Sequence, residues 1–175
     1  MVNDNTAGMV LWSKLLEYVK GKDLNNTYRF VIAPETIGMI SYLAQNQEQV
    51  ANVEGAFVVT HVVGKGEVQF KKSFLGNSYI DRVARQVIKT ETEFDIRGSD
   101  ERQLSSYPFK IPTIVITKGG LYQHDYHSSA DRVFNEDYFN ETLETYKRII
   151  DLLEEDKAYV RTSPCEPMLS KHGDR

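Results

Sequence analysis

The sequence contains a single cysteine, Cys165, so no disulfide can form within the chain. Low cysteine usage is typical of a reducing compartment, and we expect a cytoplasmic protein. Long apolar runs are lacking too, because no stretch approaches the roughly 20 apolar residues that a membrane helix needs. The N-terminal sequence Met1–Asn5 also lacks the charged-then-apolar order of a secretory signal. We therefore expect no membrane partner.

Basic residues are fewer than acidic ones: the chain has 21 lysines and arginines and 25 aspartates and glutamates, which gives a formal net charge of −4. A nucleic-acid-binding surface needs a basic face, so we expect no nucleic-acid partner. What is present is ordinary for a globular protein: 41% apolar and 26% charged residues. A length of 175 residues is enough for one domain with a sizeable core.

The pattern of apolar residues alternates between strand and helix along the chain. Apolar spacing predicts helices, and β-branched or aromatic runs predict strands. We expect helices over residues 6–20, 37–45, 79–89 and 135–156, strong strands over 27–33, 55–63 and 113–117, a short edge strand over 68–72, and loops over 90–112 and 118–134. This alternation predicts an α/β fold with three layers, in which helices cover both faces of a mostly parallel central sheet.

The predicted sheet is incomplete. Three strong strands are few for such a fold, and the first helix begins almost at Met1 without a strand before it. We therefore predict that residues 1–160 form part of a larger domain. Residues 161–175 are polar and contain Pro164 and Pro167, which predicts a tail that leaves the domain.

Three candidate metal ligands, Asp4, Glu35 and His127, lie in predicted loops. A fourth, His61, lies inside the predicted strand over 55–63, towards its carboxyl end, and could also be a strand residue packed against the sheet edge. In open α/β sheets, ligands bind beyond the carboxyl ends of the strands. Carboxylates and imidazoles together suit zinc. Spacing alone leaves simpler roles open, because Asp4 could cap the first helix, Glu35 could be a solvated turn residue and His127 an exposed loop residue.

Five segments, in order, resemble the co-catalytic zinc exopeptidases, the group that includes bacterial leucyl aminopeptidases and glutaminyl cyclases. They are NDNTAGM at 3–9, RFVIAPETIGMISYL at 29–43, FVVTHVVG at 57–64, GSDERQ at 98–103 and YHSSAD at 126–131. With EPMLSKHG at 166–173, they are most similar to a subgroup of uncharacterised bacterial aminopeptidase-like proteins. The resemblance implies that an N-terminal half of the domain and a following module are absent from this chain.

The resemblance assigns metal-binding roles to three of the candidates. Asp4 matches the metal-bridging Asp, Glu35 the metal-binding Glu, and His127 the last His ligand. The first His of the family would lie before Met1, and His61 stands where the family has its second-metal Asp. These departures predict one zinc ion rather than two.

The general base is left open by the same comparison. The family has a Glu before its metal-binding Glu, but this chain has Pro34 there, so either Glu35 is the base or another residue supplies it. Glu101 is a candidate substitute base. The resemblance places Asp100 near the site, where it supports a metal ligand or contacts the amine of a substrate, and Arg102 is a candidate either to bind a carboxylate or to form a surface ion pair. Asp125 or Asp131 is expected to orient His127 by a hydrogen bond.

Two functions remain open. The first is a zinc-dependent aminopeptidase-like hydrolase that removes N-terminal residues from a peptide, or cleaves a related small amide, through metal-activated water. The second is a catalytically impaired or non-catalytic relative that binds a peptide, an amine or a modified sugar. The chain as given is also expected to be a fragment, and uncovered strand edges predict poor solubility or a homo-oligomer.

Overall fold

The computed structural model of this protein describes residues 1–156. The predicted tail, with Cys165 and the EPMLSKHG segment, lies outside the described residues. After a turn at Val2–Thr6 the elements are α1 (Ala7–Val19), α2 (Ile37–Gln45), α3 (Gln47–Val50), β1 (Ala56–Val59), β2 (Val68–Lys71), α4 (Tyr79–Val87), β3 (Thr90–Thr92), α5 (Asp100–Ser105), β4 (Thr113–Lys118) and α6 (Glu136–Glu155).

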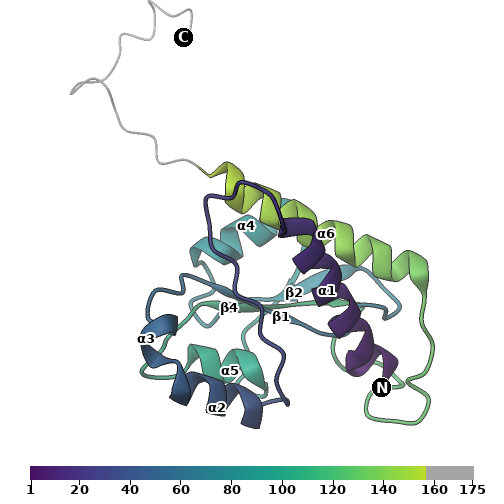
Figure 1. The fold of residues 1–175 in the computed structure, drawn as a ribbon. Helices are drawn as coiled ribbons and strands as arrows, with labels where there is room; N and C mark the ends of the chain where they lie inside the picture. The colour runs from purple at the N-terminus through teal and green to yellow at the C-terminus, as the bar shows by residue number, and fades with distance from the viewer. Residues whose placement is uncertain (157–175) are drawn as a thin grey trace, which may run out of the picture.

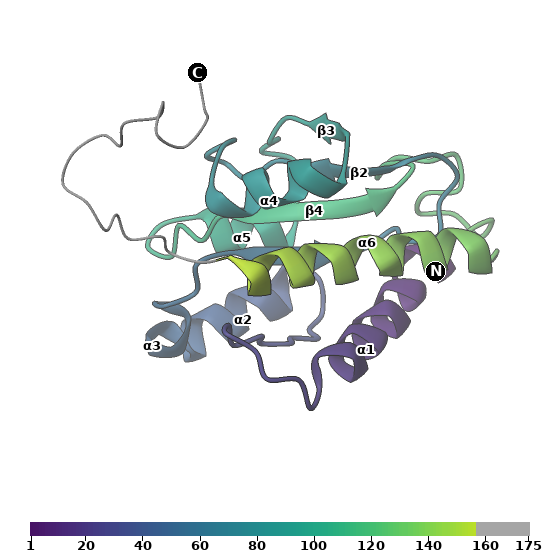
Figure 2. The same cartoon turned by 90° about the horizontal axis from the view of Figure 1, so that it is seen from above.

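The strands of the described chain form one sheet in the order β1-β4-β2-β3. β1 pairs parallel to β4 and β2 parallel to β3, whereas β2 and β4 are antiparallel. Helices α1, α4 and α6 cover one face, and α2, α3 and α5 cover the other (Figures 1 and 2). The predicted α/β fold with three layers is confirmed, with a sheet of mixed direction.

Regular apolar spacing gives α1 and α6 one apolar side each, and both helices bury that side in the same core. Leu11 and Leu15 are one turn apart on α1, and Tyr146 and Ile150 are one turn apart on α6, so each pair points to one side of its helix. All four are buried in the larger core, and every residue of the central strand β4 is buried. A second core under α2, α3 and α5 contains Met39, Leu43, Val50, Leu104 and Ile111.

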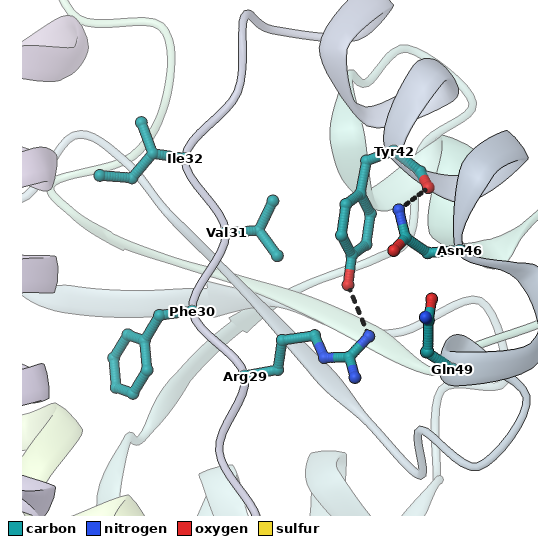
Figure 3. A pocket seen from close by; sticks show the side chains of 7 residues that line it. All are labelled: Arg29, Phe30, Val31, Ile32, Tyr42, Asn46 and Gln49. Carbon is teal, nitrogen blue, oxygen red and sulfur yellow. Dashed lines mark hydrogen bonds between the residues drawn. The ribbon is translucent and has the colours of Figure 1, made fainter.

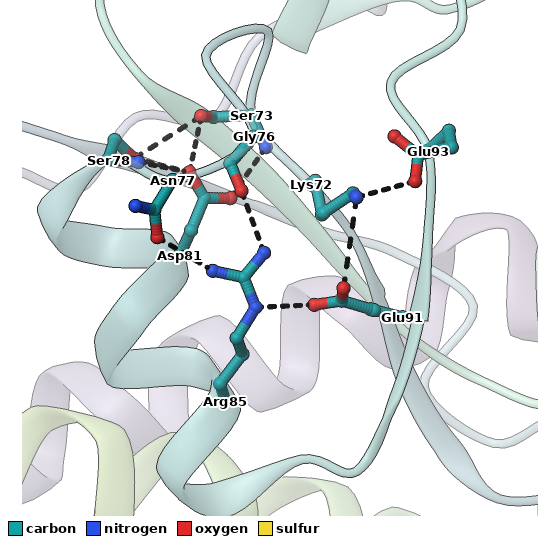
Figure 4. A network of polar contacts seen from close by, with 9 residues as sticks. All are labelled: Lys72, Ser73, Gly76, Asn77, Ser78, Asp81, Arg85, Glu91 and Glu93. Carbon is teal, nitrogen blue, oxygen red and sulfur yellow. Dashed lines mark hydrogen bonds and ion pairs between the residues drawn. The ribbon is translucent and has the colours of Figure 1, made fainter.

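A polar network fixes the start of α4. The buried Asp81 carboxylate accepts hydrogen bonds from the amide and hydroxyl of Ser78, at 2.7 and 2.6 Å, and from the amide and hydroxyl of Ser73, at 2.8 and 2.6 Å (Figure 4). A carboxylate in the first turn satisfies amides that have no partner within the helix. Ser78 at the helix start confirms the predicted position of this helix.

Residues 27–33 are not a strand in the structure, although their sequence predicts one. Their composition is β-rich, but a strand exists only where a neighbouring backbone supplies hydrogen bonds. Within residues 1–156, no backbone amide or carbonyl of this segment has such a partner. The prediction for 27–33 is therefore wrong for this chain as it stands.

Three further features of the secondary structure differ from those the sequence predicts. β1 ends at Val59 rather than at residue 63, because His61 adopts a left-handed backbone conformation with φ of 51°. β2 is not an edge strand, since it lies between β4 and β3. The predicted loop over 90–112 contains β3 and α5, whose short polar sequences carry no strong periodicity.

Candidate functional site

Asp4 and His127 meet at the edge of the sheet where β1 and β4 end. Asp4 lies in the turn before α1, and His127 in the loop after β4. The His127 Nε2 is 3.2 Å from the Asp4 Oδ2. The Asp4 side chain is 28% exposed and that of His127 is 61% exposed, so the pair is open to solvent. The turn before α1 and the loop after β4 thus bring together two of the residues that the sequence predicts as metal ligands.

Asp131 holds the backbone that carries Asp4. Its carboxylate accepts hydrogen bonds from the amides of Asn3 and Asp4, at 2.7 and 3.0 Å. Burial raises the pKa of this carboxyl, but these amides and the N-terminal amine outweigh it and leave the pKa below its usual range. The sequence predicted that Asp125 or Asp131 would orient His127, but among the described residues no hydrogen bond joins either to its imidazole. Asp131 positions the other member of the pair.

His61 lies buried beside this pair. Thr60 Oγ1 is 2.8 Å from its Nδ1, and among the described residues its buried Nε2 has no hydrogen-bond partner. Burial lowers the pKa of His61, so the imidazole is neutral near pH 7. The ring of Tyr126 lies 5.6 Å from His61 and stacks on His127 at 3.8 Å between centroids. A neutral imidazole with a free nitrogen is chemically suited to bind a metal.

Glu35 and Asp100 line the same cleft as Asp4 and His61. Glu35 is exposed at the turn before α2, and Asp100 Oδ1 accepts a hydrogen bond from the Thr36 amide at 2.8 Å. Burial raises the pKa of Asp100, and the nearby charges of Glu35 and Glu101 raise it further, against the Thr36 bond. This part of the cleft, here called the acidic wall, therefore carries two neighbouring carboxyl groups.

Glu101 and Arg102 are engaged elsewhere. The Glu101 carboxylate forms a buried ion pair with Lys71 and accepts a hydrogen bond from the Ser99 amide at 3.1 Å. Its side chain is 3% exposed, so the geometry favours a structural role over the predicted one as a general base. Arg102 is exposed and donates to the carbonyl of Ile96 at 3.4 Å. Sequence reasoning missed Lys71, because its partner is distant in the chain.

A cleft of about 1210 Å³ connects these groups. Asp4, Glu35, His61 and Asp100 all line it, together with the aromatic residues Tyr122 and Tyr126. Within residues 1–156, however, no three side chains of the His, Cys, Asp or Glu type gather closely enough to hold a metal ion. The structure unites Asp4 with His127 and places Glu35 and His61 on the walls of the same cleft.

Comparison with known proteins places this chain in a family. The family described as "Domain of unknown function (DUF4910)" matches residues 1–156, so the chain belongs to it. No helix of the described residues is long and apolar enough to span a membrane. The resemblance to zinc exopeptidases stays a prediction.

Two relatives from Clostridium acetobutylicum are similar over nearly the whole chain. A protein named "Putative polysaccharide biosynthesis protein with aminopeptidase-like domain" is 31% identical over 99% of this chain and 42% of its own length. A crystal structure titled as that of a "putative peptidase" has a TM-score of 0.89 and 30% identity, over 98% of this chain and 43% of that one. The fold is thus that of a peptidase-like α/β protein, and this chain spans less than half the length of both relatives.

Proposed function

We propose that this member of the DUF4910 family contributes part of the active site of a zinc-dependent aminopeptidase-like hydrolase. The observation that carries the proposal is the meeting of Asp4 and His127 at 3.2 Å, since the sequence predicts both as ligands of one ion. The names of the relatives, aminopeptidase-like and peptidase, support a hydrolase of this type. The substrate would be a peptide or a small amide with a free amine.

The separation of Asp4 and His127 fits two ligands of one zinc ion. Zinc–oxygen and zinc–nitrogen bonds are about 2.0–2.2 Å, so two ligands at a tetrahedral angle lie roughly 3.4 Å apart. The observed 3.2 Å is close to this value. An ordinary ion pair has the same length, so the distance is compatible with zinc without requiring it.

A third ligand would come from the walls of the cleft. His61 offers a buried, neutral nitrogen without a partner, and Glu35 offers an exposed carboxylate. Either side chain would have to move, because the described residues contain no preformed group of three. Zinc bound there would polarise a scissile carbonyl and promote attack by water.

The acidic wall suits the recognition of an amine. Asp100 is held by the Thr36 amide at the start of α2 and stands next to Glu35. If Glu35 does not bind zinc, its exposed carboxylate is the best placed general base, since Glu101 is occupied by Lys71. Arg102 is exposed on α5 and donates to the Ile96 carbonyl, and it is not among the described residues that line the cleft, so its binding of a carboxylate stays a prediction.

A second function is favoured by two specific observations. Pro34 stands where the resembling enzymes have a glutamate, and Glu101 is locked in a buried ion pair. Both observations remove candidates for the general base. The alternative is therefore a non-catalytic relative that uses the same cleft to bind a peptide, an amine or a modified sugar.

Zinc titration of the purified chain by calorimetry tests the site. We expect one zinc ion per chain, and a loss of affinity of about tenfold or more for Asp4→Asn and for His127→Gln, because each removes one ligand. His124→Gln is the matched control, since His124 is an exposed histidine of the same loop. Equal affinity for all three variants would place the zinc elsewhere.

Hydrolysis of leucine p-nitroanilide separates the two functions. The hydrolase predicts turnover that requires zinc and that Glu35→Gln reduces. Zinc binding without any turnover, also in a longer protein that includes this chain, would favour the non-catalytic relative instead.

A further inference from the structure

Asp100 and Glu101 are neighbours at the start of α5, but their carboxylates make contacts in different directions. Asp100 Oδ1 accepts a hydrogen bond from the Thr36 amide at 2.8 Å, in the turn that carries Glu35. Glu101 forms its ion pair with Lys71, the last residue of β2. These two adjacent residues thus connect the acidic wall of the cleft to the sheet.

The Lys71–Glu101 pair is buried and anchored on the sheet. The two side chains are 7% and 3% exposed, and within residues 1–156 Lys71 has no other ion-pair partner. The backbone of Lys71 lies opposite Val115 of β4 on one side and Thr92 of β3 on the other, so it cannot move without the sheet. Separating the two side chains would leave each buried charge alone, which is strongly unfavourable. The pair therefore holds Glu101 at a fixed place.

The segment before α5 is folded against this pair. The Ser99 amide donates to the Glu101 carboxylate at 3.1 Å. Gly98 lies so close that a Cβ atom there would overlap the same carboxylate and lie 3.3 Å from the Lys71 Nζ. The pair therefore fixes the backbone directly before Asp100.

The turn at Thr36 needs such a restraint. Its φ of 59° is a left-handed conformation that a β-branched residue rarely adopts. Further along α2, the Tyr42 hydroxyl accepts a hydrogen bond from Arg29 at 3.0 Å and ties the helix to the segment before the turn (Figure 3). The bond from Thr36 to Asp100 holds the turn itself, directly beside Glu35.

We propose that Lys71 and Glu101 are a positioning pair for the acidic wall, which fixes Asp100 and, through Asp100, the turn that carries Glu35. The contacts lead from β2 to the start of α5 and on to the start of α2, and these two helices lie side by side on one face of the sheet (Figure 1). The amine-binding role of the wall rests on the proposed function, whereas the positioning does not.

The positioning matters because both carboxyl groups of the wall have to face the same amine. An ammonium group donates through several N–H bonds, and charge-assisted bonds need oxygens about 2.7–2.9 Å away. Glu35 is exposed, so its place depends on the backbone of the turn rather than on packing. A shift of this turn or of Asp100 therefore weakens recognition of the amine without removing either carboxyl group.

The double variant Lys71→Met/Glu101→Leu separates positioning from stability. It replaces both buried charges by apolar side chains, which leaves no charge without a partner and should keep the melting temperature near that of wild type. It also removes the acceptor of the Ser99 amide. Asp81→Asn is the control, because it disturbs a buried carboxylate at α4, on the other face of the sheet.

Amide hydrogen exchange of Thr36, measured by NMR in EDTA, requires neither zinc nor turnover. In the double variant we expect exchange at Thr36 to be about tenfold faster relative to the amides of β4, because the Asp100 bond is less well held. In Asp81→Asn this ratio should keep its wild-type value. An unchanged ratio in the double variant, or an equal change in the control, would overturn the proposal.

Gly98→Ala provides an independent variant if the double variant does not fold. It keeps both charges, but its Cβ displaces the Glu101 carboxylate. We expect the same selective increase of exchange at Thr36. A wild-type exchange ratio in Gly98→Ala would overturn the proposal as well.

Titration with L-leucinamide, which carries a free amine, tests the consequence for recognition. Binding is followed through the chemical shifts of the Glu35 and Thr36 amides. We expect the Kd to rise about tenfold in the double variant, the size of effect expected for one weakened hydrogen bond to a charged group, and to stay unchanged in Asp81→Asn. Faster Thr36 exchange with unchanged affinity would keep the positioning role and refute the acidic wall as the amine site, which separates a failure of the proposed function from a failure of this inference.

Discussion

The Asp4 carboxylate and the His127 imidazole lie 3.2 Å apart on separate loops, at the edge where the parallel strands β1 and β4 end. Each loop is positioned by a different part of the fold. Asp4 is fixed through the buried carboxylate of Asp131, and His127 stacks on Tyr126. The distance between the two side chains therefore depends on the position of both loops. The first two predictions concern zinc binding by this pair and its support by Asp131.

Zinc should stabilise the folded chain through this pair. A ligand that binds only the folded state adds about 2.7 kcal/mol to the free energy of unfolding at 100 times its dissociation constant. We expect the melting temperature to rise with added zinc and to return to its starting value with EDTA. The double variant Asp4→Asn/His127→Gln should show no rise in differential scanning fluorimetry, and an equal rise would assign the stabilisation to another site.

Asp131→Asn should weaken zinc binding without removing a ligand. Asparagine replaces one of the two carboxylate oxygens by an NH2 group, so the amide of either Asn3 or Asp4 loses its hydrogen bond and the backbone that carries Asp4 is less well held. Loss of such supporting contacts typically costs about 10–100-fold in metal affinity. Calorimetry should find this loss in Asp131→Asn but not in Asp125→Asn, the control in the same loop. Unchanged affinity in both would show that Asp131 does not position the site.

Lys71→Met should strongly destabilise the fold. It leaves the Glu101 carboxylate buried without its cationic partner, and breaking a buried pair in this way costs about 3–5 kcal/mol. The double variant Lys71→Met/Glu101→Leu should recover most of the loss in urea denaturation. The neighbouring Lys72→Met is the control, because its partner Glu93 is 86% exposed and the effect should be much smaller. A double variant no more stable than the single one would argue against this explanation.

Asp81→Asn should destabilise the protein in a pH-dependent way. Burial raises the pKa of Asp81, but the hydrogen bonds from Ser73 and Ser78 outweigh it and hold the pKa below its usual range. Because the folded-state pKa is depressed, the carboxylate stabilises the fold above its unfolded value of about 3.9 and loses this effect as pH falls. The difference in free energy of unfolding between wild type and variant, measured by urea denaturation, should therefore become smaller below about pH 4. A difference in free energy of unfolding that does not change with pH would exclude the charge of Asp81 as its cause.

Local sequence predicted the helices well. Regular apolar spacing indicated α1, α2, α4 and α6 at nearly the observed bounds, and Asn135 caps α6 through a 2.9 Å bond to the Tyr138 amide, as expected. The strand β4 was also predicted, because a continuous apolar run is buried on both faces wherever it pairs. These features depend on residues a few positions apart.

Residues that depend on distant partners could not be placed in this way. Nothing near Glu101 in the sequence indicates Lys71, and nothing near residues 27–33 shows that their backbone has no partner among the described residues. The sequence by itself determined the α/β class, the four longer helices α1, α2, α4 and α6, and the residue types of the candidate site, but not the short helices α3 and α5. Only the tertiary structure decided that Asp4 meets His127, that Asp131 supports Asp4, and that 27–33 is unpaired, because contacts between distant segments arise only when the whole sheet assembles.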